Sequence, residues 1–245
     1  MNRENVDEVQ SEYLETTSGA VDVILPDESV AELGERGVAG GLGYRFVKRA
    51  FDIAFSALVI AVLVIPVAIL CLVIVLDSPG APFFRQERIG KGGRPIHIWK
   101  LRTMVADAHE NPGRYMTGEQ LETWMREQKL DDDPRVTRVG RLLRRTSLDE
   151  LPQFVNVLVG DLSVIGPRPV TLEETYEFGD ERGELLSVRP GITGWWQATE
   201  RNAATWANGR RQELELYYVR HASLALDARV FALTLRAMFV ERTGV

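Results

Sequence analysis

The 245 residues include one cysteine and three histidines, and this scarcity excludes several classes of protein. A lone Cys71 cannot form an intramolecular disulfide, so the chain is not a disulfide-stapled secreted scaffold. The histidines are far apart in sequence, and no Cys/His cluster has the spacing of a zinc site. Gly90-Lys91-Gly92 lacks the spacing of a P-loop, and there is no internal repeat.

Charge is distributed unevenly along the chain. The net charge of −6 hides a leader, residues 1–40, with ten acids and two bases, while residues 41–105 hold nine bases and three acids. The leader is too polar to bury a core and ends in glycines, so we predict a disordered acidic tail and glycine-rich linker over 1–43. Residues 44–245 are long enough for one domain with a real core.

An apolar run of 24 residues without a charge extends from Ile53 to Leu76. A straight helix of that length, at about 1.5 Å per residue, covers the hydrocarbon core of a bilayer. The alternative is that this run forms a helix buried in the protein core. Pro66 divides the run into arms too short to cross alone, and basic residues, which prefer the cytoplasmic side, flank both ends. We therefore predict a re-entrant membrane helix at about 53–76, with a kinked spanning helix as the alternative.

A β-hairpin is predicted after this run. Strand-like segments at 83–89 and 94–104 flank the glycine-rich turn 90–93. Lys100 and Arg102 are two residues apart on the second segment, so both are expected on one face. They form either a basic strand at lipid headgroups or a cationic wall for a phosphate-rich ligand.

Asp149 and Glu150 form an acidic pair at a predicted helix start. Ser147 and Glu150 have the spacing of a capping box, and Leu151, Phe154, Val155 and Leu158 then repeat as in an amphipathic helix. Helix-start chemistry is therefore the simplest reading of the pair. The functional reading is that free N–H groups and the helix dipole keep Asp149 ionised, as suits a nucleophile or a magnesium ligand.

Two basic features favour the functional reading. Four arginines concentrate just upstream, at 138, 141, 144 and 145, which is costly unless a polyanion binds. Downstream, Pro167 and Pro169 hold Arg168 in an extended backbone, where its guanidinium can form a fixed fork for phosphate.

Five blocks, in order, resemble the bacterial sugar transferases, the monotopic polyprenyl-phosphate phosphoglycosyl transferases. The blocks are Gln86–Gly90, Lys100–Met104, Ser147–Gln153, Gly160–Pro169 and Arg189–Gly194. The resemblance covers about residues 44–245, and it is the order of the blocks that makes it specific. It implies a compact, mostly helical α+β domain on the cytoplasmic face of the inner membrane, with a β-hairpin and a proline-broken re-entrant helix.

The resemblance also implies a reaction, in which hexose-1-phosphate passes from a UDP-sugar to polyprenyl (undecaprenyl) phosphate and UMP is released. This would begin polysaccharide or glycoconjugate assembly. Asp149 would be the nucleophile that forms an aspartyl-phosphosugar intermediate and, in the predicted site, a ligand of Mg²⁺; Glu150 would complete the dyad. Our candidates for binding phosphate groups are Lys100, Arg102, Arg144, Arg168 and, more weakly, Arg201.

The chain departs from the family pattern at two places. Ile65 stands where a polar residue usually precedes the proline, and Trp195-Trp196 replaces a single tryptophan beside a small residue. We expect a minimal form without the additional membrane bundle of larger relatives. Expected partners are the UDP-sugar, the polyprenyl phosphate and membrane lipid, with no nucleic acid; homo-oligomers remain open. The alternatives are a non-catalytic membrane-anchored protein that binds polyprenyl or anionic lipid phosphates, and a membrane-bound phosphohydrolase.

Overall fold

The computed structural model describes residues 41–238 except positions 109, 128, 129, 131, 201, 202 and 207. The predicted acidic tail over residues 1–40 and the candidate Arg201 therefore lie outside the described residues.

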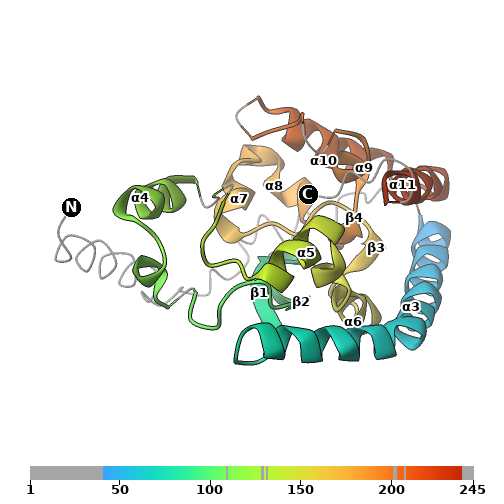
Figure 1. Cartoon of the computed structure of the whole chain (residues 1–245). Coiled ribbons are helices and arrows are strands. Elements are labelled where there is room, and N and C mark those ends of the chain that lie inside the picture. The colour runs from blue at the N-terminus through green and yellow to red at the C-terminus, as the bar shows by residue number, and fades with distance from the viewer. Residues whose placement is uncertain are drawn as a thin grey trace.

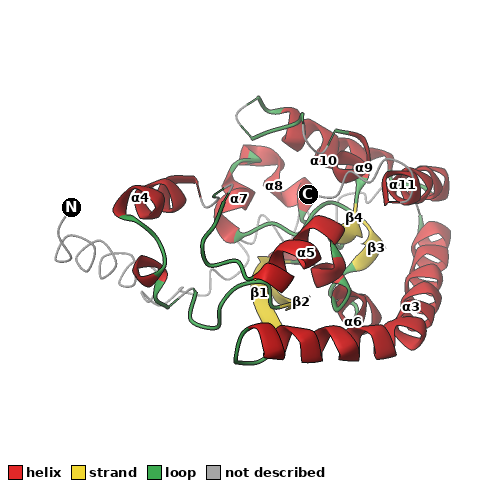
Figure 2. Cartoon of the chain, viewed as in Figure 1, coloured by secondary structure: helices red, strands yellow, loops and turns green. Residues whose placement is uncertain are grey.

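Most of the described chain is helical, and its strands are short (Figure 2). The α-helices are α3 (Leu42–Asp77), α4 (Gly118–Glu127), α5 (Arg138–Thr146), α6 (Gln153–Val159), α7 (Leu172–Tyr176), α8 (Arg182–Leu185), α9 (Trp195–Thr199), α10 (Arg210–His221) and α11 (Leu224–Arg236). The strands are β1 (Phe83–Ile89), β2 (Pro95–Leu101), β3 (Ser163–Ile165) and β4 (Gly191–Thr193). Four short 3-10 helices complete the description: η1 (Lys91–Gly93), η2 (Pro112–Arg114), η3 (Leu148–Glu150) and η4 (Gly179–Glu181). The expectation of a mostly helical α+β fold with one β-hairpin is confirmed.

Helix α3 contains the whole apolar run and begins eleven residues before it. It is the one described helix long and apolar enough to cross a membrane, and only 6% of its most apolar stretch is buried. The alternative of a buried core helix is therefore wrong. Pro66 lies inside a helix that continues on both sides, and Figure 1 shows α3 changing direction along its length.

Both arms of α3 contact the same body. The first arm packs Tyr44 and Phe55 against a core cluster that includes Val157 and Val230. The second arm packs residues 67–74 against Leu101 and Leu143. In Figure 1 the helix accordingly borders the body on two sides, first beside α11 and then beneath α5 and the hairpin. At about 1.5 Å per residue, a straight helix of 36 residues would extend about 54 Å, so the bend is what allows both contacts.

Two β pairings organise the body. β1 and β2 pair antiparallel from Phe83 opposite Leu101 to Ile89 opposite Pro95, which confirms the hairpin with a second strand shorter than predicted. β3 and β4 form an unpredicted parallel pair, which joins two of the five sequence blocks. A Cβ atom on Gly191 would lie 2.1 Å from the backbone nitrogen of Gly166, so this pairing requires glycine there.

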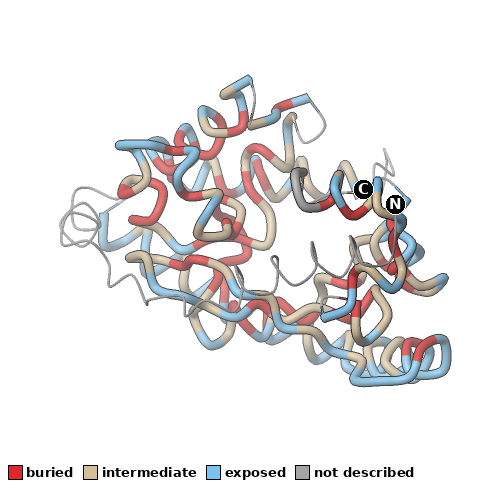
Figure 3. The backbone as a smooth tube through the Cα atoms, turned by 90° about the vertical axis from the view of Figure 1, so that its left-hand side faces the viewer, coloured by how far each residue is buried: buried red, intermediate tan, exposed pale blue. Residues whose placement is uncertain are grey.

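The principal core lies between α3, α6, α10, α11 and the strands. Its buried members include Ile98, Leu162, Val164, Tyr218 and Val230. Figure 3 shows buried stretches alternating with exposed ones along the chain. On α6 the most buried residues are Gln153, Asn156 and Val157, whereas Val155 of the predicted apolar stripe is exposed. The periodicity located this helix but did not identify its buried face.

Candidate active site

The acidic pair lies where β2 meets the turn after α5. Ser147 ends α5 in the left-handed conformation (φ 55°), its N–H bonds the carbonyl of Arg144, and the chain enters η3. The predicted capping box is therefore wrong: Ser147 makes no side-chain cap, and α6 begins only at Gln153. The left-handed turn places Glu150 beside the hairpin, where Lys100 Nζ lies 3.1 Å from Glu150 Oε1.

Asp149 is buried, with 9% of its surface exposed. Burial and the neighbouring Glu150 raise the pKa of its carboxyl group, while Lys100, its own backbone N–H and Arg144 act in the opposite direction. The surroundings of Asp149 thus raise its pKa, whereas a helix start alone would lower it. A three-residue 3-10 turn supplies too small a dipole to offset desolvation.

A pocket opens in front of Glu150, between the hairpin and the segment that follows β3. It is lined by residues from all five sequence blocks and from α9, chiefly Arg88, Lys100, Glu150, Gln153, Arg168 and Gln197. Three predicted residues, Lys100, Glu150 and Arg168, thus come together, and Asp149 is directly adjacent in the chain although it does not itself line the pocket. Gln197 Oε1 is buried with no hydrogen-bond partner among the described residues.

Arg168 is held from behind by a buried carboxyl group. The backbone N–H of Arg168 donates to both carboxyl oxygens of Glu215 at 3.2 Å, and its guanidinium lies 5.9 Å from the ring centroid of Trp196. Arg168 also lines the pocket. Complete burial raises the pKa of Glu215 to about 7, although the N–H of Arg168 and the charge of Arg211 counteract it.

Arg211 completes this support. Its guanidinium carbon lies 4.3 Å from the Trp196 ring centroid and 3.8 Å from that of Trp206, and it is within 3.6 Å of a Glu174 carboxyl oxygen. Burial lowers its pKa to about 10. Sequence reasoning missed Arg211 and Glu215 because both lie on α10, which none of the five blocks contains. It identified the unusual tryptophan pair but not that Trp196 is the buried partner of two arginines.

Arg144 is the one predicted arginine of α5 that turns toward the acidic pair. Its Nε donates to Thr103 Oγ1 at 3.0 Å. Burial lowers the pKa of Arg144, whereas the carboxylates of Asp133 and Asp149 act to raise it, which indicates that both carboxylates lie nearby. Beneath it, Asp133 and Arg135 form a buried ion pair at 2.7 Å. The upstream arginines at 138, 141 and 145 are exposed.

Arg102 does not line the pocket with Lys100, although both are predicted phosphate-binding residues. β2 ends at Leu101, and the buried guanidinium of Arg102 donates to the backbone carbonyls of Ser78, Pro79 and Gly80. Arg102 therefore secures the loop that follows α3, and these bonds occupy most of its donors. Pro66 lies in the exposed part of α3 and is no part of the pocket.

A divalent cation would find few protein ligands here. Among the residues that the structure describes, no group of three or more His, Cys, Asp or Glu side chains is arranged to hold a metal ion. Two adjacent carboxylates, Asp149 and Glu150, fit Mg²⁺, which commonly binds through one or two carboxylates, substrate phosphates and water. They do not fit a cation that needs a complete cage of protein ligands.

The model of the bacterial sugar transferase family matches residues 43–241. The chain belongs to that family. It is 38% identical over 206 residues to the UDP-glucose:undecaprenyl-phosphate glucose-1-phosphate transferase of Escherichia coli, a match that covers 82% of this chain and 42% of that protein. It is 35% identical over 236 residues to the exopolysaccharide production protein ExoY of Rhizobium meliloti, covering 93% and 97% of the two chains.

Another family member is the UDP-N-acetylgalactosamine-undecaprenyl-phosphate N-acetylgalactosaminephosphotransferase of Aeromonas hydrophila, which is 36% identical over 80% of this chain. This chain spans less than half the length of the E. coli and A. hydrophila relatives. The names of these bacterial sugar transferases contain different sugars at similar identity. Overall identity therefore does not indicate a donor.

Proposed function

We propose that this protein transfers hexose-1-phosphate from a UDP-sugar to a polyprenyl phosphate, with release of UMP, as an early step of polysaccharide assembly. The observation that carries the proposal is the pocket in which Arg88, Lys100 and Arg168 converge beside the Asp149–Glu150 pair. Three cations next to two carboxylates suit a ligand that brings several phosphate charges to a carboxylate nucleophile. The family membership and the names of the relatives point to the same reaction.

In the proposed chemistry, an Asp149 carboxylate oxygen attacks the phosphorus that carries the sugar. The bond from this phosphorus to the oxygen of UMP breaks, UMP leaves, and Asp149 holds the phosphosugar as a mixed anhydride. A phosphate oxygen of the polyprenyl carrier then attacks the same phosphorus, and Asp149 leaves as the carboxylate. Phosphoryl transfer depends mainly on positioning and charge neutralisation, which Lys100, Arg168 and Arg144 can supply.

Mg²⁺, bound by Asp149 with or without Glu150, would neutralise diphosphate charge and favour the ionised form of the aspartate. The raised pKa of Asp149 makes that assistance useful. Arg102 is omitted from the phosphate-binding set because its guanidinium is bonded to the loop after α3. Arg88 takes its place, since it lines the pocket.

The membrane arrangement is part of the proposal. We place α3 as a re-entrant helix in the cytoplasmic leaflet of the inner membrane. Both its arms pack on one body, and Asp77 at its end accepts a hydrogen bond from the Val139 N–H at 3.2 Å. A helix with both ends tied to one domain emerges on the side from which it entered. Labelling of cysteines placed at Val47 and Phe83, in a Cys71→Ser background, should find both on the cytoplasmic side; opposite sides would leave a spanning helix.

Release of UMP tests the catalytic proposal. The full chain in detergent micelles, with Mg²⁺, polyprenyl phosphate and a panel of UDP-sugars, should release UMP with at least one donor. Asp149→Asn should abolish release, whereas Asp132→Asn, at an exposed aspartate outside the pocket, should leave it unchanged. No release with any donor would favour a phosphate-binding protein. Full-rate, continuing release without the lipid acceptor would favour a phosphohydrolase.

A further inference from the structure

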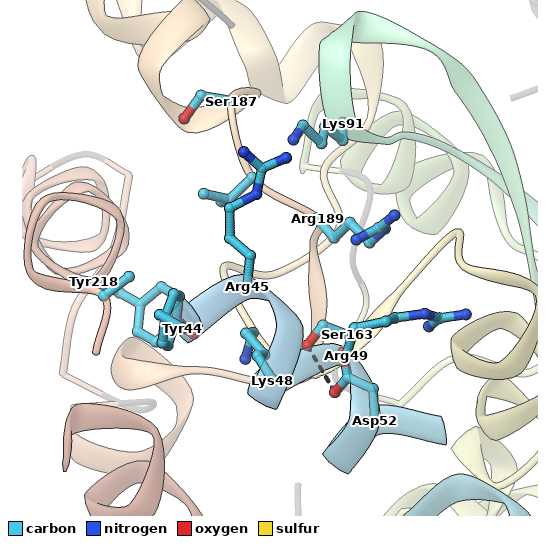
Figure 4. A pocket seen from close by; sticks show the side chains of 12 residues that line it. Tyr44, Arg45, Lys48, Arg49, Asp52, Lys91, Ser163, Ser187, Arg189 and Tyr218 are labelled. Atoms are coloured by element: carbon cyan, nitrogen blue, oxygen red, sulfur yellow. Dashed lines mark hydrogen bonds between the residues drawn. The ribbon is translucent and has the colours of Figure 1, made fainter. Parts of the chain in front are cut away.

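A second pocket, about 540 Å³ in volume when its open mouth is included, lies at the start of α3 and shares no lining residue with the candidate active site (Figure 4). It is formed by the first turns of α3, the turn of the hairpin, and residues 187–189 before β4. Its lining includes five basic side chains: Arg45, Lys48, Arg49, Lys91 and Arg189. The acidic residue in the lining is Asp52.

Some of these charges already have partners. Lys48 pairs with Asp227 at 2.9 Å, and Arg49 donates to the carbonyls of Val157 and Leu158 at the end of α6. Asp52 accepts hydrogen bonds from the Ser163 hydroxyl and the Val164 N–H, the first of which is drawn in Figure 4. These contacts fix the first arm of α3 to the body, and they leave Asp52 turned to β3.

Arg45 and Lys91 are different. Among the described residues neither side chain has a hydrogen bond or ion pair, and Figure 4 shows the guanidinium of Arg45 turned toward Lys91. Arg189 stands nearby and uses its Nε on the Gly160 carbonyl at 2.8 Å, which leaves its terminal nitrogens available. Burial lowers the pKa of Lys91, and the charges of Arg45 and Arg189 lower it further.

Each of the three cations comes from an element whose backbone is fixed elsewhere, although the side chains of Arg45 and Arg189 are exposed. The hairpin turn is held by the Gly92 N–H, which donates to the Leu186 carbonyl at 2.8 Å. The Ser163 N–H donates to the carbonyl of Pro190, next to Arg189, at 2.8 Å. Arg45 is one turn from Lys48 and Arg49, which anchor α3. The backbone thus holds like charges together, at a cost that a bound anion would offset.

We propose that Arg45, Lys91 and Arg189 bind a phosphate group outside the candidate active site. Two guanidinium groups and an ammonium group offer the charge and the several donors that a phosphate requires. Arg45 lies eight residues before the apolar run of α3, so an anionic phospholipid headgroup is one source of the phosphate. A soluble phosphate is the other. Along β2, five residues at about 3.4 Å each separate Pro95, beside the turn, from Lys100, so one phosphate cannot serve both pockets.

Binding to the full chain in detergent micelles tests this proposal without requiring catalysis. The probes are phosphatidylglycerol, whose retention is compared with that of phosphatidylcholine by native mass spectrometry, and inorganic phosphate, followed by ³¹P line broadening. The variants are Arg45→Gln and Lys91→Gln. Arg94→Gln is the matched control, because it removes the same charge three residues from Lys91, from an exposed side chain outside the pocket. Lys91→Arg keeps the charge and should retain binding.

We expect Arg45→Gln and Lys91→Gln each to weaken binding at least tenfold, with Arg94→Gln like the parent chain. If phosphatidylglycerol shows that pattern, the bound phosphate belongs to a lipid headgroup. If only inorganic phosphate shows it, the site binds a soluble phosphate. Circular dichroism melting of each variant verifies that the fold persists. Equal binding by all variants, or no binding of either probe, would overturn the proposal.

Discussion

Replacing Glu215 with glutamine should remove a loss of stability that the parent chain suffers as the pH rises. Glu215 is fully buried on α10, and its pKa rises from 4.5 to about 7 on folding. The unfolded chain therefore releases this proton first as the pH rises, so the folded state loses stability until the pH exceeds about 7 and does not regain it above that pH. One pKa unit corresponds to about 1.4 kcal/mol, so this group removes about 3 kcal/mol of folding free energy between about pH 4 and pH 8.

Glu215→Gln keeps an oxygen that can accept from the Arg168 N–H but cannot ionise. Relative to the parent, the variant should gain about 3 kcal/mol of stability from about pH 4 to pH 8. Unfolding in detergent micelles, followed by circular dichroism over this range, measures the difference. Glu213→Gln, at an exposed position two residues away, should show no such trend. If the parent instead gains stability over the variant as the pH rises, then Arg211 and the Arg168 N–H outweigh desolvation and our reasoning about Glu215 is refuted.

Three other variants and one pH profile test the description of the site. A Cβ on Gly140 would lie 1.9 Å from the Thr103 carbonyl oxygen, so Gly140→Ala should destabilise the fold by about 1–3 kcal/mol or more. Gly43→Ala should not destabilise it, because nothing lies within 4 Å of a Cβ at that position. Equal melting temperatures for the two variants would contradict this packing. Arg135→Ala should cost about 3–5 kcal/mol because Asp133 stays buried without its partner, and a loss below about 1 kcal/mol in unfolding experiments would show that water reaches this pair. Arg102→Gln should lower the melting temperature with little change in the KM for the donor, because Arg102 holds the loop after α3. A raised KM with unchanged stability would instead show that Arg102 binds the donor phosphates. Because the pKa of Asp149 is raised and the nucleophile must be ionised, kcat/KM should fall as the pH falls through a value above the usual aspartate range; an acid limb in the usual range would argue against the buried environment described.

The sequence predicted those elements whose patterns are local. The strand at 83–89 matches the described one, and the apolar run lies within α3, because alternation and charge-free length need no knowledge of the fold. Local patterns do not predict contacts between segments that are distant in the sequence. Nothing in the Ser147–Glu150 spacing reveals that Ser147 takes a left-handed turn at the end of α5.

The site could be predicted in part for the same reason. Lys100, Glu150 and Arg168 come from sequence blocks and do meet at one pocket. Arg102, in one of the same blocks, turns to the loop after α3, since the strand ends one residue before it. Glu215 and Arg211 act from behind Arg168, and a single buried carboxyl group on a mixed helix has no signature in a sequence taken alone.

The central claim is that Asp149 becomes covalently attached to the phosphosugar. It is tested most directly by mixing the full chain with Mg²⁺ and a UDP-sugar that supports UMP release, omitting the lipid acceptor, and quenching rapidly for peptide mass spectrometry. We expect a hexose-phosphate adduct on the peptide that contains Asp149, about one equivalent of UMP per chain, and loss of the adduct when polyprenyl phosphate is added. UMP release that requires the acceptor from the first turnover, with no adduct on that peptide, would contradict it.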